Sequence, residues 1–237
     1  APVTPSINLS PDKKHLLILE RTSLPSIAEL SQPELRLAGL RINPKTNGRS
    51  RTNNYKSIII KNIDSSKEKK VRGLPKSSHI SNVFWAPNGK HIAISVINGD
   101  RINLYLADVK NGKAKLLIKK PLNAIYGSAV YWLSDSEGLI VKTIIENRGG
   151  VPVKNSVPDG PIIQENLGKV SPARTYQDLL ANPDDEDLFD YYMTAQVYYV
   201  GINGKIKKIG KPGIIRRAEP SPDGQYILME TIHRPYS

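Results

Sequence analysis

Four histidines are the side chains in this sequence best suited to acid–base chemistry or metal binding. His15, His79, His91 and His233 lack the spacing that is typical of metal ligands. His15 and His91 follow the same kind of turn, which favours a structural role in a repeated unit. His233, within Ile232-His233-Arg234-Pro235-Tyr236, has no such explanation and could line a cavity that faces another domain. We therefore predict no metal site and keep His233 as a candidate substrate-binding residue.

An acidic run, Asn182-Pro183-Asp184-Asp185-Glu186-Asp187, has a composition that could suit a cation. A calcium loop needs alternating oxygen ligands, a central glycine and a closing bidentate glutamate, and the run lacks all three. Asparagine caps helices well, proline suits the first helical position, and acidic side chains favour the positive end of a helix. The run therefore predicts the start of a helix that continues through 188–192. A shorter helix is expected before it, near Tyr176-Gln177-Asp178-Leu179-Leu180.

The sequence lacks the usual signatures of nucleophilic and phosphate chemistry. It contains no cysteine, which excludes disulfides, thiolate nucleophiles and cysteine-ligated metals from this segment. No G-x-S-x-G motif supplies a serine nucleophile, and no G-x-x-x-x-G-K or G-x-G-x-x-G motif supplies a phosphate cradle. The residues therefore predict no catalytic group and no cofactor in this chain.

Four similar turns recur along the chain, and each is followed by a short apolar strand. The turns are Ser10-Pro11-Asp12-Lys13, Ala86-Pro87-Asn88-Gly89, Leu133-Ser134-Asp135-Ser136 and Ser221-Pro222-Asp223-Gly224. The strands that follow them are 16–19, 92–94, 139–141 and 226–229. A turn that leads into a strand, repeated along a sequence, is typical of β-propeller blades.

The clearest repeat unit runs from Ser78 to about Lys120. Four strands are expected in it, at 79–85, 91–97, 102–109 and 113–118. Asn98-Gly99 predicts a tight hairpin with two central residues of positive φ, and Asn111-Gly112 predicts the next turn. The unit therefore reads as a four-stranded antiparallel meander of about 40 residues, the expected size of one blade.

The predicted fold is all-β: a single incomplete β-propeller over residues 1–237, built of four-stranded antiparallel blades. Only the interval between Pro87 and Ser134 matches a bare blade, so the longer intervals on either side are expected to hold insertions. About three blades and the start of a fourth are expected, with a small helical insertion. The blade-like modules lie at about 6–75, 78–120, 124–212 and 214–237, and the insertions at about 21–55 and 146–195.

The formal net charge of +12 could indicate a nucleic-acid-binding surface. Many lysines instead recur in strands that follow turns, after Ser66, Gly112 and Gly204. In a propeller these would be outer edge strands, where lysine blocks pairing with another chain. They are expected to end near Pro75, Pro121 and Pro212. Charge spread around a circumference, without aromatic stacking residues, predicts no nucleic-acid partner.

A further option is an envelope-associated protein that binds acidic polymers through its positive charge. A steep salt dependence of polyanion binding would support this option, and an absence of binding at low salt would remove it.

The chain shows no long apolar run, so no membrane span is expected. Its first residues contain no basic stretch followed by an apolar core, so no signal peptide is expected either. The last repeated turn comes shortly before the final residue, and we therefore expect this sequence to be part of a larger protein.

Several longer segments are more distinctive than the turns, namely 10–21, Pro33–Pro44 with Thr46-Asn47-Gly48, Ala173–Leu180, Glu219–Gly224 and Ile232–Tyr236. These segments resemble the N-terminal propeller of glutamyl endopeptidase-like members of the prolyl oligopeptidase family. The Pro-Asp-Gly turns alone are shared with TolB-like propellers, whereas the longer segments are more specific. The resemblance spans nearly the whole chain, and both insertions carry it.

The resemblance implies a parent with a C-terminal α/β-hydrolase domain that holds a Ser-Asp-His triad, none of which is in this chain. The implied substrate is a peptide, and the propeller would restrict access to the nucleophile and dock the hydrolase domain. A basic cavity wall would suit glutamate-directed cleavage, and Arg216 and Arg217 are the candidates for it. The paired glutamates of dipeptidyl peptidases have no clear match, because Pro33 interrupts the spacing of Glu29 and Glu34.

The alternative is a non-enzymatic TolB-like propeller that serves as a scaffold for protein–protein interaction. A hydrolase domain elsewhere in the parent would separate the two readings. The family resemblance favours an exported, periplasmic protein.

Overall fold

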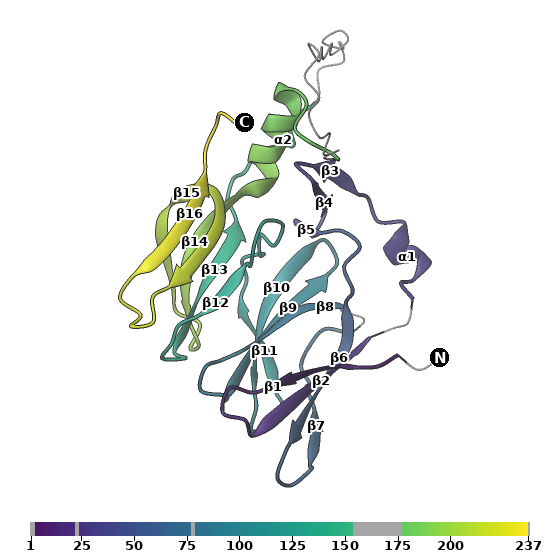
Figure 1. The fold of residues 1–237 in the computed structure, drawn as a ribbon, viewed down its shortest axis with the longest axis vertical. Helices are drawn as coiled ribbons and strands as arrows, with labels where there is room; N and C mark the ends of the chain where they lie inside the picture. Colours follow the sequence, from purple (N-terminus) through teal and green to yellow (C-terminus); the bar gives the residue numbers. More distant parts are fainter. Residues whose placement is uncertain (1–2, 22–23, 77–78, 154–176, 237) are drawn as a thin grey trace, which may run out of the picture.

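The computed structural model describes residues 3–21, 24–76, 79–153 and 177–236. This part of the chain is mostly β-strand, arranged in antiparallel sheets. Two larger sheets stand side by side, and a small sheet and helix α2 lie together at one end of the molecule (Figure 1). Residues 154–176, which include part of the segment 173–180 named above, lie outside the described residues.

The first large sheet contains two groups of four strands. The first group is β1 (Ser6–Leu9), β2 (His15–Arg21), β6 (Tyr55–Asn62) and β7 (Glu68–Lys70). The second group is β8 (His79–Trp85), β9 (His91–Asn98), β10 (Arg101–Asp108) and β11 (Ala114–Ile118). A single pairing, Tyr55 with Ile80, joins the two groups. The second group is the antiparallel meander that the sequence predicts between 78 and 120.

The hairpin between β9 and β10 lies one residue later than predicted. Asn98 pairs with Arg101, so the two turn residues are Gly99 and Asp100. Only Gly99 has a positive φ, of 63°. Glycine at the first central position allows the mirror-image turn that needs one positive φ, and Asn98 can therefore remain in the strand.

The second large sheet is β12 (Val130–Trp132), β13 (Gly138–Ile144), β14 (Thr194–Gly201), β15 (Ile206–Pro220) and β16 (Ile227–Ile232). The expectation that a strand ends near Pro212 is wrong, because β15 continues through it. β15 pairs with β14 up to Ile214 and with β16 from Ile214 onward. The pairing with β14 is irregular between Ile209 and Gly213, and a bulge there tolerates a proline that has no N–H to donate.

The core lies between strand groups, because the central strands bury both faces. In β9, Ile92 and Ile94 pack toward the first group, whereas Ala93 packs toward the second sheet. Successive side chains of a strand point to opposite faces of the sheet. A strand that is covered on both faces therefore has an unbroken run of apolar residues. A third apolar cluster joins β13 and β14 to Ile215 and Ala218 of β15. Strand groups packed face to face are typical of a propeller, and the number of blades stays a prediction.

The two segments that the sequence predicts as insertions pack against each other. The first contains α1 (Ile27–Leu30) and a small sheet of β3 (Leu35–Leu37), β4 (Leu40–Asn43) and β5 (Gly48–Arg49), and the second contains α2 (Pro183–Met193). Leu37 and Ile42 share one apolar cluster with Phe189 and Met193. Segments far apart in the sequence thus form one cap at the end of the strand groups (Figure 1).

Helix α2 begins as predicted. The Asn182 side chain accepts a hydrogen bond from the Asp185 N–H at 2.9 Å, and Pro183 occupies the first turn. The prediction of a shorter helix near 176–180 is wrong for residues 177–180, because 177 and 178 form a bend and 179 and 180 have no regular secondary structure. Asp178 has a φ of 59°, outside the helical region, and its carbonyl accepts a hydrogen bond from the Gly39 N–H at 2.9 Å. This contact with the first insertion fixes the segment in a non-helical conformation.

Candidate functional site

A cavity of about 640 Å³ lies along the first strands of the successive groups. Asn8 of β1, Ser81 and Asn82 of β8, and the segment 127–129 ahead of β12 contribute to its lining. Most of the polar residues that line it carry an amide or a hydroxyl group. Arg49 is the one charged side chain among the described residues that line it.

A second cavity of about 350 Å³ adjoins the first beneath the first insertion. The two share four lining residues, namely Arg49, Thr52, Asn53 and Ile97. The smaller cavity also contacts Ser26, Glu29 and Gln32 around α1, and His79 at the start of β8. A ligand in the larger cavity could therefore extend toward the insertion.

Strand β5 places Arg49 at the junction of the two cavities. Gly48 forms a parallel bridge with Ala124, and an added Cβ at Gly48 would lie 2.5 Å from Cδ1 of Ile102. This close approach holds β5 against the second strand group. The Arg49 Nε then donates a hydrogen bond to the Ile125 carbonyl at 3.2 Å. Within the described chain, the Arg49 guanidinium forms no ion pair with a carboxylate.

The neighbouring arginines are paired, which distinguishes them from Arg49. Glu34 contacts Arg51 at 3.0 Å, Arg36 at 3.3 Å and Arg41 at 4.0 Å, and it accepts a hydrogen bond from the Ser50 hydroxyl at 3.0 Å. Desolvation raises the pKa of the Glu34 carboxyl, but these hydrogen bonds and positive charges outweigh it, so the pKa lies below its usual value.

Glu29 has a structural role at the start of α1. It accepts a hydrogen bond from the Ser26 N–H at 2.7 Å, while the Ser26 hydroxyl accepts one from the Glu29 N–H, which completes a capping box. The backbone hydrogen bond from Ser26 is the main reason why the pKa of Glu29 lies below its usual value. His79 Nδ1 lies 3.3 Å from the same carboxylate. Glu29 and Glu34 therefore have separate partners and do not form a glutamate pair.

The predicted candidates Arg216, Arg217 and His233 do not line either cavity. Arg216 contacts Glu230 at 2.7 Å and Arg217 contacts Glu219 at 3.4 Å, and about half of each arginine side chain is exposed. His233 Nε2 lies 3.0 Å from the Thr231 hydroxyl, on the surface. The structure thus spreads these three residues over β15 and the segment after β16 and does not bring them together at a cavity.

His15 and His91 occupy equivalent places, as the repeat indicates. Each begins the second strand of its group and pairs with the last residue of the third strand, Asn62 and Asp108 respectively. Among the residues described, no group of three or more His, Asp or Glu side chains could hold a metal ion. No helix in the described ranges is both long and apolar enough to cross a membrane.

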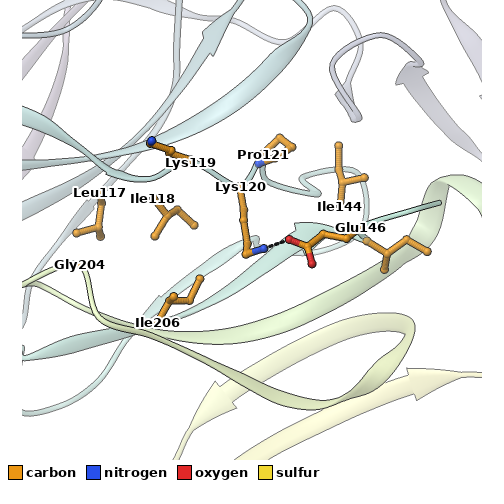
Figure 2. Close-up of a pocket in the computed structure, with 10 residues that line it drawn as sticks. Leu117, Ile118, Lys119, Lys120, Pro121, Ile144, Glu146, Gly204 and Ile206 are labelled. Atoms are coloured by element: carbon orange, nitrogen blue, oxygen red, sulfur yellow. Dashed lines mark hydrogen bonds and ion pairs between the residues drawn. The ribbon is translucent and has the colours of Figure 1, made fainter.

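A third hollow, a groove of about 660 Å³, lies where the end of β11, the end of β13 and the turn before β15 meet (Figure 2). Its floor is apolar and includes Ile118, Ile144 and Ile206. Lys120 and Glu146 form an ion pair at one side. The hydrogen bond from Lys120 holds the pKa of Glu146 below its usual value. Lys119 also lines the groove, so the hollow combines an apolar floor with one ion pair and a further lysine.

Sequence reasoning missed Lys142, a fully buried lysine of β13. Its Nζ donates to the backbone carbonyls of Tyr126, Ile215 at 2.9 Å and Arg216 at 3.3 Å. Burial lowers the pKa of Lys142 to about 8. A charged residue inside the otherwise apolar run Leu139–Thr143 is the signal that could have identified it.

Two plant proteins match this chain along its whole length. It is 42% identical over 251 aligned residues to a protein of Oryza sativa subsp. japonica named "Probable glutamyl endopeptidase, chloroplastic". It is 38% identical over 250 aligned residues to a protein of the same name from Arabidopsis thaliana. The chain spans 26% of the length of each relative. No family model matches the sequence.

Solved structures resemble this chain more distantly. TolB from Acinetobacter baumannii aligns with 98% of this chain and 38% of its own, at 14% identity and a TM-score of 0.44. A prolyl endopeptidase aligns with 83% of this chain and 25% of its own, at 12% identity and a TM-score of 0.43. The sequence identity along the whole of this chain therefore decides its relationship: the chain is homologous to the N-terminal region of plant glutamyl endopeptidases.

Proposed function

We propose that this chain is the N-terminal propeller segment of a serine peptidase, in which it gates access of peptides and docks an α/β-hydrolase domain. The observation that carries the proposal is 42% identity over the whole chain to a protein named as a glutamyl endopeptidase. The chain corresponds to about a quarter of that relative, so the catalytic serine would come from the remaining part.

Exposed apolar side chains at the two ends of the strand groups support a docking role. Ile7 and Leu9 of β1 are 65% and 49% exposed, and Tyr226 and Leu228 near β16 are 70% and 64% exposed. Large apolar side chains gathered on a sheet face usually mark a contact with other protein. We propose that further chain of the parent covers both ends.

The cavity beside β1, β8 and the segment before β12 supports a gating role. It is large enough for a short peptide segment, and its lining of amides and hydroxyls can hydrogen-bond to a peptide backbone. Folded proteins would be too wide for it, so the parent should cleave peptides and spare folded substrates.

Labelling of the native gene product tests the proposal. An antibody against this segment captures the protein, which is then treated with a fluorophosphonate probe for active serines. A labelled band several times heavier than 26.3 kDa is expected, with cleavage of unstructured peptides and no cleavage of folded proteins. An unlabelled product of any mass would contradict the peptidase role and favour a non-enzymatic scaffold for protein partners.

A further inference from the structure

We propose that Arg49 binds the acidic side chain of a peptide in the cavity and so gives the site its preference for acidic residues. This inference rests on the proposed function, because it assigns substrate choice to one residue of the same cavity. Arg216 and Arg217, the arginines that the sequence suggests, already pair with Glu230 and Glu219.

The charge of Arg49 has no carboxylate partner among the described residues of the larger cavity. The seventeen described residues that line the larger cavity include Arg49 and no carboxylate. In the smaller cavity the carboxylate of Glu29 is held by Ser26 and His79. A cation without a carboxylate partner, facing a polar cavity, attracts an anionic ligand more strongly than an arginine that is already paired.

The Arg49 guanidinium has a geometry that suits a carboxylate. The hydrogen bond from Nε to the Ile125 carbonyl uses one of its five N–H groups and orients its plane. Nη1 and Nη2 have no hydrogen-bond acceptor among the described residues. Two terminal nitrogens side by side match the two oxygens of a carboxylate, which lysine or glutamine cannot match in the same way.

The backbone that carries Arg49 is held firmly. Gly48 beside it is buried against Ile102, and Asn47 donates a hydrogen bond to the Tyr192 carbonyl at 3.2 Å. The backbone of Arg49 is thus held between the second strand group and α2, while its side chain is exposed to solvent and oriented by the hydrogen bond to the Ile125 carbonyl. A side chain that starts from a held backbone and is already oriented loses less freedom when it binds, which favours specificity.

The test uses the full-length gene product and two blocked pentapeptides that differ only in a central glutamate or glutamine. For Arg49→Gln we expect kcat/KM for the glutamate peptide to fall at least tenfold, with the value for the glutamine peptide changing less than twofold. Arg49→Lys should give an intermediate loss. Arg72→Gln, at an exposed arginine that lines neither cavity, is the matched control and should keep the wild-type ratio.

The outcomes separate the two proposals. If the protein cleaves peptides but Arg49→Gln keeps its glutamate preference, or loses both activities equally, the assignment of Arg49 is wrong and the peptidase role stands. If no peptide is cleaved and no serine is labelled, the peptidase role is wrong. Calorimetric binding of the two pentapeptides to wild type and Arg49→Gln then decides on Arg49 independently: loss of selective glutamate binding supports it, and unchanged binding overturns it.

Discussion

The buried ammonium of Lys142 donates a hydrogen bond to the backbone carbonyl of Ile215 at 2.9 Å, across 73 residues of sequence. Lys142 belongs to β13, whereas Ile215 lies in the part of β15 that pairs with β16. The same Nζ also reaches the carbonyls of Tyr126 and Arg216. One side chain of β13 therefore contacts both the segment before β12 and the part of β15 that pairs with β16, with three donors matched to three acceptors.

We expect Lys142→Met to destabilise the second large sheet by about 2 kcal/mol. The substitution removes a buried charge, which is favourable, but it leaves the buried Ile215 carbonyl and the partly buried Tyr126 and Arg216 carbonyls without their donor, and a buried unsatisfied acceptor costs about 1–3 kcal/mol. Hydrogen exchange of β13 and β15 amides in the full-length gene product measures the effect. Lys205→Met, at an exposed turn, is the control. Unchanged protection in Lys142→Met would show that the three hydrogen bonds add no net stability.

The stability of this region should increase from about pH 8 to pH 10. Burial lowers the pKa of Lys142 to about 8, while the ordinary value is 10.5. Below pH 8 the lysine is protonated in both the folded and the unfolded chain. Between the two values the unfolded chain binds more protons, so a rise in pH favours the folded state, by at most about 3 kcal/mol. Urea denaturation of wild type and Lys142→Met over this pH range isolates the contribution of Lys142 to the free energy of unfolding. Parallel plots of that free energy against pH for the two proteins would contradict the prediction.

Two glycines with similar backbone conformations should differ sharply in their tolerance of alanine. Gly127 and Gly99 have φ values of 69° and 63°. A Cβ at Gly127 would lie 2.1 Å from the Arg216 carbonyl oxygen, whereas a Cβ at Gly99 meets nothing within 4 Å. Gly99→Ala should cost only the strain of positive φ, about 1 kcal/mol, and Gly127→Ala about 3 kcal/mol or more. Denaturation midpoints give the comparison, and equal losses would mean that β15 moves aside without cost.

Loss of the N-cap should weaken α2. Asn182→Ala removes the acceptor for the Asp185 N–H and should cost about 1 kcal/mol, whereas Asn182→Asp keeps an acceptor and should cost much less. Hydrogen exchange of the amides of α2 measures both variants. Because Phe189 and Met193 pack on Leu37 and Ile42, protection of β3 and β4 should fall together with that of α2 in Asn182→Ala. A loss confined to α2 would show that the two insertions are not energetically coupled.

Local patterns in the sequence determined the elements that depend on neighbouring residues. The repeated turns predicted β2, β9, β13 and β16, and Asn182 with Pro183 predicted the start of α2, because caps and turns are satisfied within a few residues. The identity to two plant relatives along the whole of this chain explains why the longer segments resemble one family.

Contacts between distant segments decided the rest. Nothing near Asp178 in sequence indicates that Gly39 will bind its carbonyl, so the expected short helix is absent from 177–180. The course of β15 past Pro212 depends on a bulge opposite β14 and on β16 as a second partner. The residue type alone does not distinguish Arg216 from Arg49. Only the folded chain gives the first a carboxylate partner in Glu230 and leaves the second facing a cavity, because ion pairing depends on distances of a few ångströms.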